Sequence, residues 1–387
     1  MGISKMKDVD VVTLSLRYHD LTSLPESPGQ LSNLRCLDLT GNKLSSLPAW
    51  FENLTDLEQL YLDGNQLSSL PTWLANLISL KELHIDANQL TTLPANIDRL
   101  TNLQTLSVYC NQLFSIPESL SQMTGLKELS LGKNLLTSLP ESFWQLTNLQ
   151  ILNLAENRLT SLSENIGNLT GLHTLDLGHN ELNTLPESLG KLTNLTYFLY
   201  LSNNRLTVLP DTLFENLSNL RYLNVTDNQL TTLPENIGNL TNLRELRAYN
   251  NQLTSLPEAL GRLVYLQELH VMNNKLASLP GSIGHLNNLK EFHLSHNRLT
   301  ALPESLCNLT RLTHLDLRNN RLMELPVSIG NLQCLTHLDL RANRLVSLPA
   351  SIGELMHLEK LDLRWNKLSS YPGWLQRLEQ CGRAVYT

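Results

Sequence analysis

An asparagine recurs along almost the whole chain at a nearly constant spacing, and this spacing constrains the fold more than any other feature. Neighbouring members of the series are 23 residues apart, except for two intervals of 24 near the middle of the chain. His19 occupies the same slot one period before the first member, which makes sixteen units. A fixed period of about 20–50 residues is the signature of a solenoid built from stacked units. The members are Asn42, Asn65, Asn88, Asn111, Asn134, Asn157, Asn180, Asn204, Asn228, Asn251, Asn274, Asn297, Asn320, Asn343 and Asn366.

Leucines surround each slot in the pattern L-x-x-L-x-L-x-x-N-x-L, as in Leu57 to Leu67. The L-x-L part alternates with period two, so it predicts a short strand with one apolar and one outward face. One such strand cannot bury its leucines alone, whereas strands of neighbouring units can do so together. Backbone groups at the bend after each strand need partners, and a stacked asparagine amide offers both a donor and an acceptor. We therefore expect a ladder of asparagines, which His19 interrupts.

Prolines predict where each unit turns back. Fifteen of the sixteen prolines lie six residues after the slot, and Ser163 fills this place in the remaining unit. Proline suits the start of a helical turn but not a central strand, and the hydroxyl of Ser163 could cap the same turn. The segments that follow, such as "PESLGKLTNL" from Pro186, predict single turns or 3₁₀ helices. The extra residue in each 24-residue interval is most simply Phe198, as a strand irregularity, and Phe214, as a wider convex loop.

The unit "LTNLxxLxLxxNxLTSLPExIGNL" resembles the 23-residue repeat of the Ras-group intracellular leucine-rich repeat proteins, which also occurs in bacterial leucine-rich repeat proteins. The resemblance implies an α/β solenoid, a horseshoe with a concave parallel β-sheet and short 3₁₀ or irregular convex segments. We expect residues 1–10 to form a short N-terminal cap, 11–373 the repeat domain and 374–387 a short C-terminal cap. The repeat is shared by proteins with unrelated partners, so the resemblance says little about function.

We therefore expect the residues that determine function to lie six, four and two positions before each slot asparagine, where side chains point to the concave face. In the last three units these positions stack aspartates beside arginines. One interpretation is a solvated ladder whose charges compensate each other. The other is that the arginines grip a carboxylate-rich partner, with Trp365 as an aromatic anchor. The predicted partner-binding residues are Arg318, Arg341, Arg364, Asp316, Asp339, Asp362, His314, His337, Trp365, Tyr200, Tyr222, Tyr249, Arg247, His270 and His293.

The concave face is expected to change character along the chain. Near the N-terminus it is acidic, because Asp38, Asp63, Glu82 and Asp86 lie in the outward positions. In the middle it is aromatic, with Phe198 added to the tyrosines if the insertion lets it face outward. The partner surface would then be acidic opposite the last units and basic opposite the first.

His270 and His293, with glutamates beside them, could hold a divalent metal. Exposed histidines on a sheet more often bind nothing, so we expect neither a metal nor a cofactor. No nucleophile elbow, HExxH pair or phosphate-binding glycine loop is present, and the chain is not expected to be an enzyme. The net charge of −7 argues against nucleic acid as a partner.

The N-terminus lacks the apolar core of a signal peptide, no stretch is apolar enough to span a membrane, and the five scattered cysteines suit free thiols. We therefore expect a cytoplasmic, monomeric, non-enzymatic scaffold that captures a partner protein on its concave face. One alternative is a secreted or host-delivered effector or ligand sensor that binds and masks a host protein. Another is a self-associating protein whose terminal strands, Val11–Leu16 and Leu361–Leu363, present open edges.

Overall fold

The computed structural model describes residues 12–25, 31 and 33–387, and the chain forms two compact units, Met1–Leu182 and Asn183–Thr387. The expected N-terminal cap at residues 1–10 and the first residue of the expected edge strand, Val11, lie outside the described residues. Both units consist of coils of one kind. Each coil contributes one three-residue strand and, in most coils, one 3₁₀ helix, so both units have the α/β leucine-rich repeat solenoid fold that the sequence predicted.

In the described part of the first unit, eight parallel strands lie side by side in chain order. These strands are β1 (Thr13–Ser15), β2 (Cys36–Asp38), β3 (Gln59–Tyr61), β4 (Glu82–His84), β5 (Thr105–Ser107), β6 (Glu128–Ser130), β7 (Ile151–Asn153) and β8 (Thr174–Asp176). The 3₁₀ helices of this unit are η2 (Ala49–Asn53), η3 (Thr72–Asn76), η4 (Ile97–Arg99), η5 (Glu118–Gln122), η6 (Glu141–Gln145) and η7 (Glu164–Asn168).

The second unit is described throughout and repeats the same arrangement in nine strands. They are β9 (Phe198–Tyr200), β10 (Tyr222–Asn224), β11 (Glu245–Arg247), β12 (Glu268–His270), β13 (Glu291–His293), β14 (His314–Asp316), β15 (His337–Asp339), β16 (Lys360–Asp362) and β17 (Ala384–Tyr386). The helices are η8 (Glu187–Lys191), η9 (Glu235–Asn239), η10 (Glu258–Arg262), η11 (Gly281–His285), η12 (Glu304–Asn308), η13 (Ile329–Asn331), η14 (Ala350–Glu354) and the α-helix α1 (Gly373–Gln380).

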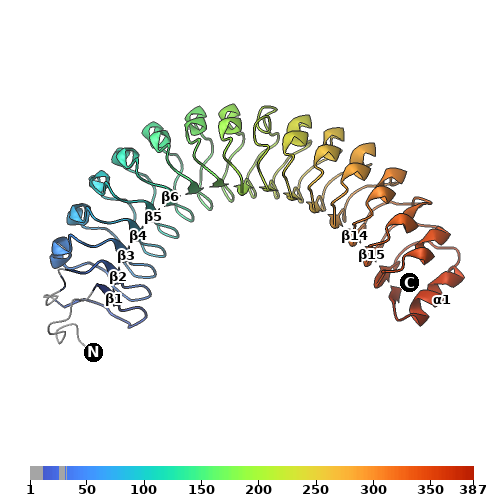
Figure 1. Cartoon of the computed structure of the whole chain (residues 1–387), viewed down its shortest axis with the longest axis horizontal. Coiled ribbons are helices and arrows are strands. Elements are labelled where there is room, and N and C mark those ends of the chain that lie inside the picture. Colours follow the sequence, from blue (N-terminus) through green and yellow to red (C-terminus); the bar gives the residue numbers. More distant parts are fainter. Residues whose placement is uncertain (1–11, 26–30, 32) are drawn as a thin grey trace. The chain divides into compact units, whose positions relative to one another are not determined.

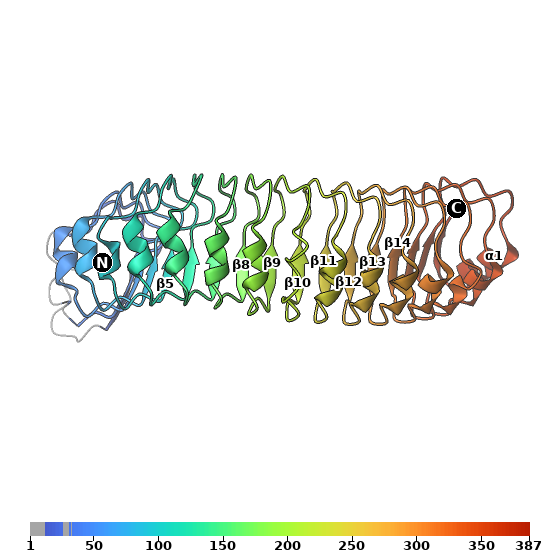
Figure 2. The ribbon, with the colours of Figure 1, turned by 90° about the horizontal axis from the view of Figure 1, so that it is seen from above.

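Within each unit, the strands line the inner side of the coils and the 3₁₀ helices line the outer side, with the leucine core between them (Figure 1). Seen from above, the coils of a unit lie beside one another like the turns of a spring (Figure 2). The register places equivalent residues side by side, as in Leu246 beside Leu269. Both leucines are fully buried, because the inward position of each strand packs on the same position of its neighbours.

The asparagine ladder is present, and Asn251 shows how one amide joins two neighbouring coils. Its Nδ2 donates to the carbonyl oxygens of Val225 (2.9 Å), in the preceding coil, and Ala248 (3.3 Å), in its own coil. Its Oδ1 accepts the N–H of Leu230, also in the preceding coil, at 3.0 Å. The side chain of Asn251 is buried, so backbone groups that water cannot reach are paired through it. At the first coil, Asn42 Oδ1 accepts the N–H of His19, which cannot continue the ladder.

The turn at Ser163 follows the prediction from its hydroxyl. Ser163 has the same extended backbone as the prolines in this position, and its Oγ accepts the N–H of Asn165 at 3.1 Å. The proline ring and the serine hydroxyl are thus two ways to begin the same 3₁₀ helix.

The first extra residue lies in front of β9 and not within it, so the prediction that Phe198 itself makes the strand irregular is wrong. Phe198 pairs in register with Tyr222. The N–H of Arg221 donates to the oxygen of Thr196 (3.1 Å), two residues before β9, whereas Arg244 bonds to the residue directly before β10. The chain therefore bulges at Thr196 and Tyr197, and the strand that follows keeps its inward and outward positions.

The second extra residue lies on the outer side of its coil. Residues 211–216, which include Phe214, form turns in place of the 3₁₀ helix found in the neighbouring coils. The Phe214 ring is fully buried. An additional residue on this side widens the loop without disturbing the sheet, as expected.

The C-terminal segment adds a helix and a strand. α1 covers the end of the core with Trp374, Leu375 and Leu378, and β17 pairs in parallel with β16. The prediction that Leu361–Leu363 is an open edge is therefore wrong, because β17 takes up its hydrogen bonds. Among the described residues, no helix has the length and apolar character that crossing a membrane requires.

Candidate functional site

The strand face of each unit is the surface formed by residues six, four and two positions before each slot asparagine. Side chains between these positions point inward and are buried, as Leu315 and Leu317 are. Many side chains at the three outward positions, such as Asp316 and Arg318, are partly exposed, whereas some, such as Asp362, are buried. The candidate residues from Tyr200 to Arg364 all occupy these outward positions of the second unit.

A hollow of about 350 Å³ lies on the strand face around β14 and β15. At its centre the rings of His314 and His337 stack, with their centroids 4.5 Å apart and an angle of 12° between the rings. Burial and the neighbouring His337 lower the pKa of His314. The lining residues are His293, His314, Leu315, Asp316, Arg318, His337, Leu338, Asp339, Arg341 and Lys360.

The arginines beside this hollow are held by aspartates of the same sheet. Arg341 Nε donates to Asp339 Oδ1 at 2.9 Å, and the same atom lies 3.3 Å from Asp362 Oδ2. Arg364 Nη2 donates to Asp362 Oδ2 at 2.6 Å. This geometry is that of the self-compensating ladder, in which the guanidinium donors face the sheet's own carboxylates.

Asp362 is the one member of the ladder with a fully buried side chain, at 0% exposure. Burial acts to raise the pKa of Asp362, but the bonds from Arg364 and the charge of Arg341 outweigh it, and the net effect lowers the pKa. The Arg364 guanidinium also lies over the ring of Tyr386 from β17, 5.1 Å from its centroid. The C-terminal strand therefore completes the environment of this carboxylate.

Trp365 lies beside the strand face and not on it. It is the residue directly before Asn366, where the backbone adopts a left-handed conformation with φ of 62°. Its side chain is 71% exposed, and the Arg364 guanidinium lies 5.5 Å from the centre of its ring. The expected aromatic anchor is thus available to a partner, but from the rim of the sheet.

Three aromatic rings form a continuous cluster on β9 and β10. Phe198 lies 5.6 Å from Tyr200 and 5.5 Å from Tyr222, and the two tyrosines are 5.1 Å apart. Phe198 faces outward and is 40% exposed. Arg247 lies over the Tyr222 ring at 5.7 Å. Burial raises the pKa of Tyr222 to about 12. Tyr249 lies outside these ring contacts within the described part of the chain.

His270 and His293 form a second stacked pair, with ring centroids 4.6 Å apart. Each Nε2 lies near a glutamate of its own strand, at 3.2 Å from Glu268 and 3.1 Å from Glu291. Burial lowers the pKa of His270, and the charges of His293 and Arg247 act in the same direction, against Glu268.

We expect the lowered pKa of His270 to make the fold less stable in mild acid. The unfolded chain binds this proton at the ordinary pKa of 6.5, above the folded pKa, so stability falls as the pH drops below about 6.5. Thermal unfolding midpoints at pH 7 and pH 5 measure this loss. It should be smaller in a His270→Gln variant and unchanged in the exposed control His285→Gln. Equal losses in all three proteins would contradict the prediction.

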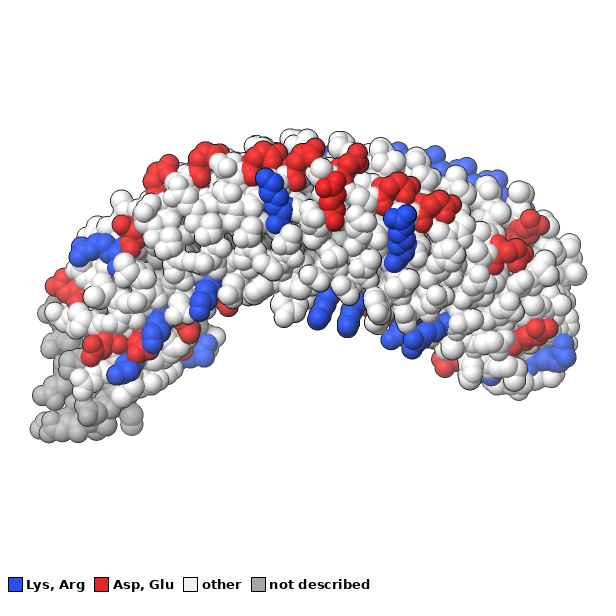
Figure 3. Space-filling view, turned by 45° about the horizontal axis from the view of Figure 1, so that its top comes forward, with Lys and Arg blue, Asp and Glu red and all other residues white. Residues whose placement is uncertain are grey.

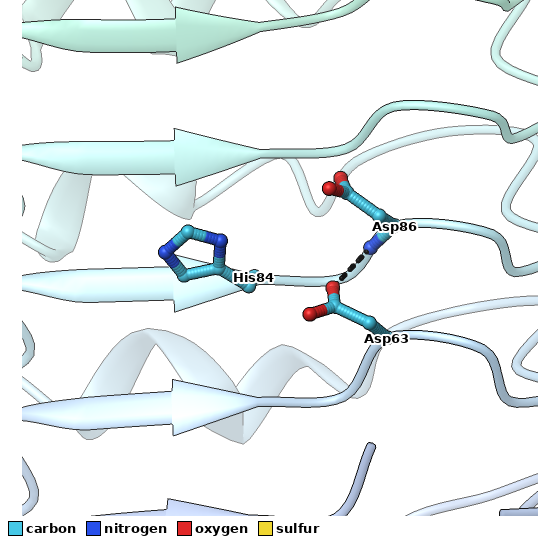
Figure 4. Close-up of side chains that lie close together, drawn as sticks. All are labelled: Asp63, His84 and Asp86. Carbon is cyan, nitrogen blue, oxygen red and sulfur yellow. Dashed lines mark hydrogen bonds between the residues drawn. The ribbon is translucent and has the colours of Figure 1, made fainter. Parts of the chain in front are cut away.

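Two features of the surface were not singled out from the sequence. Acidic side chains gather on the outer side of the coils (Figure 3), where glutamates begin many 3₁₀ helices, as Glu141 does in η6 and Glu258 in η10. The second feature is a group on the strand face of the first unit, formed by Asp63, His84 and Asp86 (Figure 4). The two aspartates were predicted to make this region acidic, whereas His84 was overlooked.

Comparison with known families agrees with this architecture. A family model described as leucine-rich repeat region matches residues 141–248, 212–303 and 303–384. A second, described as leucine rich repeat, matches residues 10–67 and 101–159. The chain belongs to the leucine-rich repeat family. No curated protein compared with this leucine-rich repeat chain matches it.

Solved leucine-rich repeat structures resemble the chain over most of its length. A leucine-rich repeat protein of Leptospira interrogans is 37% identical, with a TM-score of 0.89, over 98% of this chain and 96% of that one. The effector YopM of Yersinia pestis is 29% identical, with a TM-score of 0.66, over 93% and 89%. The Arabidopsis receptor kinase HAESA, solved with the peptide hormone IDA and the co-receptor SERK1, is 28% identical, with a TM-score of 0.70, over 97% and 74%.

Proposed function

We propose that this leucine-rich repeat chain is a non-enzymatic, cytoplasmic and monomeric scaffold that captures a partner protein on the strand face of its second unit. One observation carries the proposal: the ring cluster of Phe198, Tyr200 and Tyr222 lies on the same unit and the same face as the hollow at β14 and β15. Exposed aromatic rings and partly desolvated arginines are the residues that dominate protein interfaces.

The two parts of this surface have different roles in the proposal. The aromatic cluster supplies apolar area at low cost in side-chain entropy, because its rings already pack on one another. The hollow supplies orientation through the charge of Lys360 and through hydrogen bonds that the histidine rings can donate, both of which suit an acidic segment of the partner. The arginine ladder holds the shape of this region, since Arg341 and Arg364 are engaged by aspartates of the sheet. Leucine-rich repeat proteins that bind protein ligands, such as HAESA with the peptide hormone IDA, support this class of function.

The double variant Phe198→Ser/Tyr222→Ser tests the proposal. Intact chains, wild type and variant, are used to capture proteins from a lysate of the source cells, and the captured proteins are quantified by mass spectrometry. Loss of two anchors from the centre of an interface should weaken capture of a specific partner about ten-fold or more. The fold should be retained, because both side chains lie on the surface of the sheet.

The matched control is Phe114→Ser, since Phe114 is 58% exposed but lies outside the strand face. This variant should capture the same partner as the wild type. A partner retained equally by the double variant, or lost equally from the control, would show that binding does not use the aromatic cluster. Circular dichroism of all three proteins establishes that they are folded.

A second candidate is a secreted or host-delivered effector that masks a host protein. The likeness to the leucine-rich effector YopM over 93% of this chain favours it. Both candidates use the same face and differ in where the partner resides. Detection of the tagged protein in the culture medium of its own cells, without release of a cytoplasmic marker, would favour the effector.

A further inference from the structure

Asp63, His84 and Asp86 bring three ligand-type side chains together on the strand face of the first unit. Asp63 follows β3, while His84 ends β4 and Asp86 follows it, so two neighbouring coils contribute (Figure 4). One side-chain atom from each residue can be chosen so that all three atoms lie within 4.8 Å of one another. All three side chains are partly buried.

Each carboxylate is oriented by bonds to only one of its oxygens. Asp63 Oδ1 accepts the N–H of Asp86 at 2.7 Å. Asp86 Oδ1 accepts the Ser107 hydroxyl and the N–H of Tyr109, both at 2.7 Å. Within the described residues, the Oδ2 atoms of both aspartates have neither a hydrogen bond nor an ion pair. One oxygen of each is thus fixed, and the other retains its lone pairs for a ligand.

His84 is oriented by stacking in place of hydrogen bonding. Its ring lies 5.0 Å from that of Tyr61, at an angle of 29°. The Tyr61 hydroxyl in turn donates to Glu82 Oε2 at 2.7 Å, which fixes the tyrosine. In the part of the chain that the structure describes, neither ring nitrogen of His84 has a hydrogen-bond partner. A neutral imidazole in this state can offer one nitrogen to a metal.

The charge of this group is not compensated as it is in the second unit. The aspartates at β15 and β16 each have a guanidinium beside them, whereas no ion pair joins Asp63 or Asp86 to an arginine or lysine among the described residues. Two adjacent carboxylates with one imidazole match a divalent cation in both charge and ligand type.

We propose that Asp63, His84 and Asp86 bind a divalent first-row transition-metal ion, such as Zn²⁺ or Co²⁺, with water completing the coordination. Zinc bonds to nitrogen and oxygen are about 2.0–2.2 Å long, so the three ligand atoms must approach each other by shifts of about 1 Å or less per side chain. The imidazole favours a transition metal over Ca²⁺ or Mg²⁺, which prefer oxygen ligands alone. This proposal does not depend on the proposed scaffold function.

The chain contains a chemically similar group that serves as a control. Ligand-type atoms of Glu245, Glu268 and His270 also lie within 4.8 Å of one another. Here, however, Arg247 Nε lies 2.5 Å from Glu245 Oε1. A guanidinium already occupies the place of a cation in this group, so it should not bind the metal.

Titration of the full chain with Co²⁺ tests the proposal, because the visible absorption of the ion reports its coordination. The exposed thiols Cys334 and Cys381 could also bind Co²⁺, so all proteins carry Cys334→Ser and Cys381→Ser. We expect one saturable site per chain, displaced by Zn²⁺. His84→Gln and Asp86→Asn should each weaken binding about ten-fold or more. His270→Gln should leave it unchanged.

Stability measurements separate loss of the site from loss of the fold. Asp86→Asn keeps a carbonyl oxygen that can accept the bonds from Ser107 and Tyr109, so its unfolding midpoint with a chelator should be close to that of the parent. Zn²⁺ should raise the midpoint of the parent and of His270→Gln but not that of His84→Gln. Absence of saturable Co²⁺ binding, or binding to His84→Gln and Asp86→Asn as strong as to the parent, would overturn the proposal.

Discussion

Replacement of one ladder asparagine, Asn251→Ala, should lower the free energy of unfolding by about 2–4 kcal/mol. The substitution leaves the N–H of Leu230 without a partner in a region from which water is excluded. It also removes one of the two bonds to the carbonyl oxygen of Val225, which keeps its bond from Asn228 Nδ2. Each buried backbone group left unpaired costs about 1–3 kcal/mol, and removal of the side chain also leaves a small cavity. Urea unfolding followed by circular dichroism measures the change.

A matched control is available in the same coil. Asn242 is exposed, and its Nδ2 makes one bond, to the oxygen of Ser218 at 3.0 Å. Asn242→Ala should cost about 0.5–1 kcal/mol, because water can replace that bond. If both substitutions cost the same, the ladder would contribute no more than an ordinary surface amide, and the account of the turns given above would be wrong.

The second large effect is expected at the buried carboxylate of the C-terminal coils. Asp362→Asn should destabilise the chain by about 1–3 kcal/mol at pH 7. It removes the negative charge between Arg341 and Arg364 but keeps the shape of the side chain. Loss of one partner of a fully buried pair costs about 3–5 kcal/mol, and the lower value expected here reflects the partial exposure of both arginines.

The same carboxylate gives this effect a pH dependence. Its pKa is lower in the folded chain than the ordinary value of 3.8, so its contribution is fully present above about pH 4 and is lost as the pH falls through the folded pKa. Unfolding midpoints of the wild type and Asp362→Asn should therefore converge in acid. Asp20→Asn is the control, since Asp20 pairs with Lys43 in an exposed position and should change the midpoint little. A difference that does not shrink as the pH is lowered below about 4 would contradict this explanation.

The repeated parts of the fold could be predicted from sequence because many copies report the same physical requirement. The asparagine slot, the inward leucines and the proline turns each recur so many times that only a solenoid of repeated coils accounts for them. The extra residue before β9 was misplaced because a count of residues between slots fixes only the length of a coil. The position of the extra residue within the coil depends on which backbone hydrogen bonds form between neighbouring coils. Here the N–H of Arg221 bonds to the oxygen of Thr196, which places the bulge before β9.

The functional surface was predictable only in part. The strand register stacks equivalent outward positions of neighbouring coils. The candidate binding residues of the second unit could therefore be placed on one face from the sequence. Side-chain conformations do not follow from the register, and the engagement of Arg341 by Asp339 appears only in the structure. β17 was missed because Ala384–Tyr386 carries no repeat pattern and becomes a strand only against β16. His84 was missed because both of its partners lie two positions before a slot asparagine, whereas His84 itself lies four positions before one.

Most strands pair with strands 23 residues away, and this has a consequence for how such a gene changes in length. The stretches "HLDLRNNRL" and "HLDLRANRL" differ at one residue, so an exchange between the segments that encode them keeps the repeat pattern on both sides of the join. An exchange between them removes or duplicates one whole coil and rejoins its neighbours through the same contacts. Each event lengthens or shortens the sheet by one strand spacing, about 4.8 Å. The set of outward side chains changes, while the packing of the core stays the same.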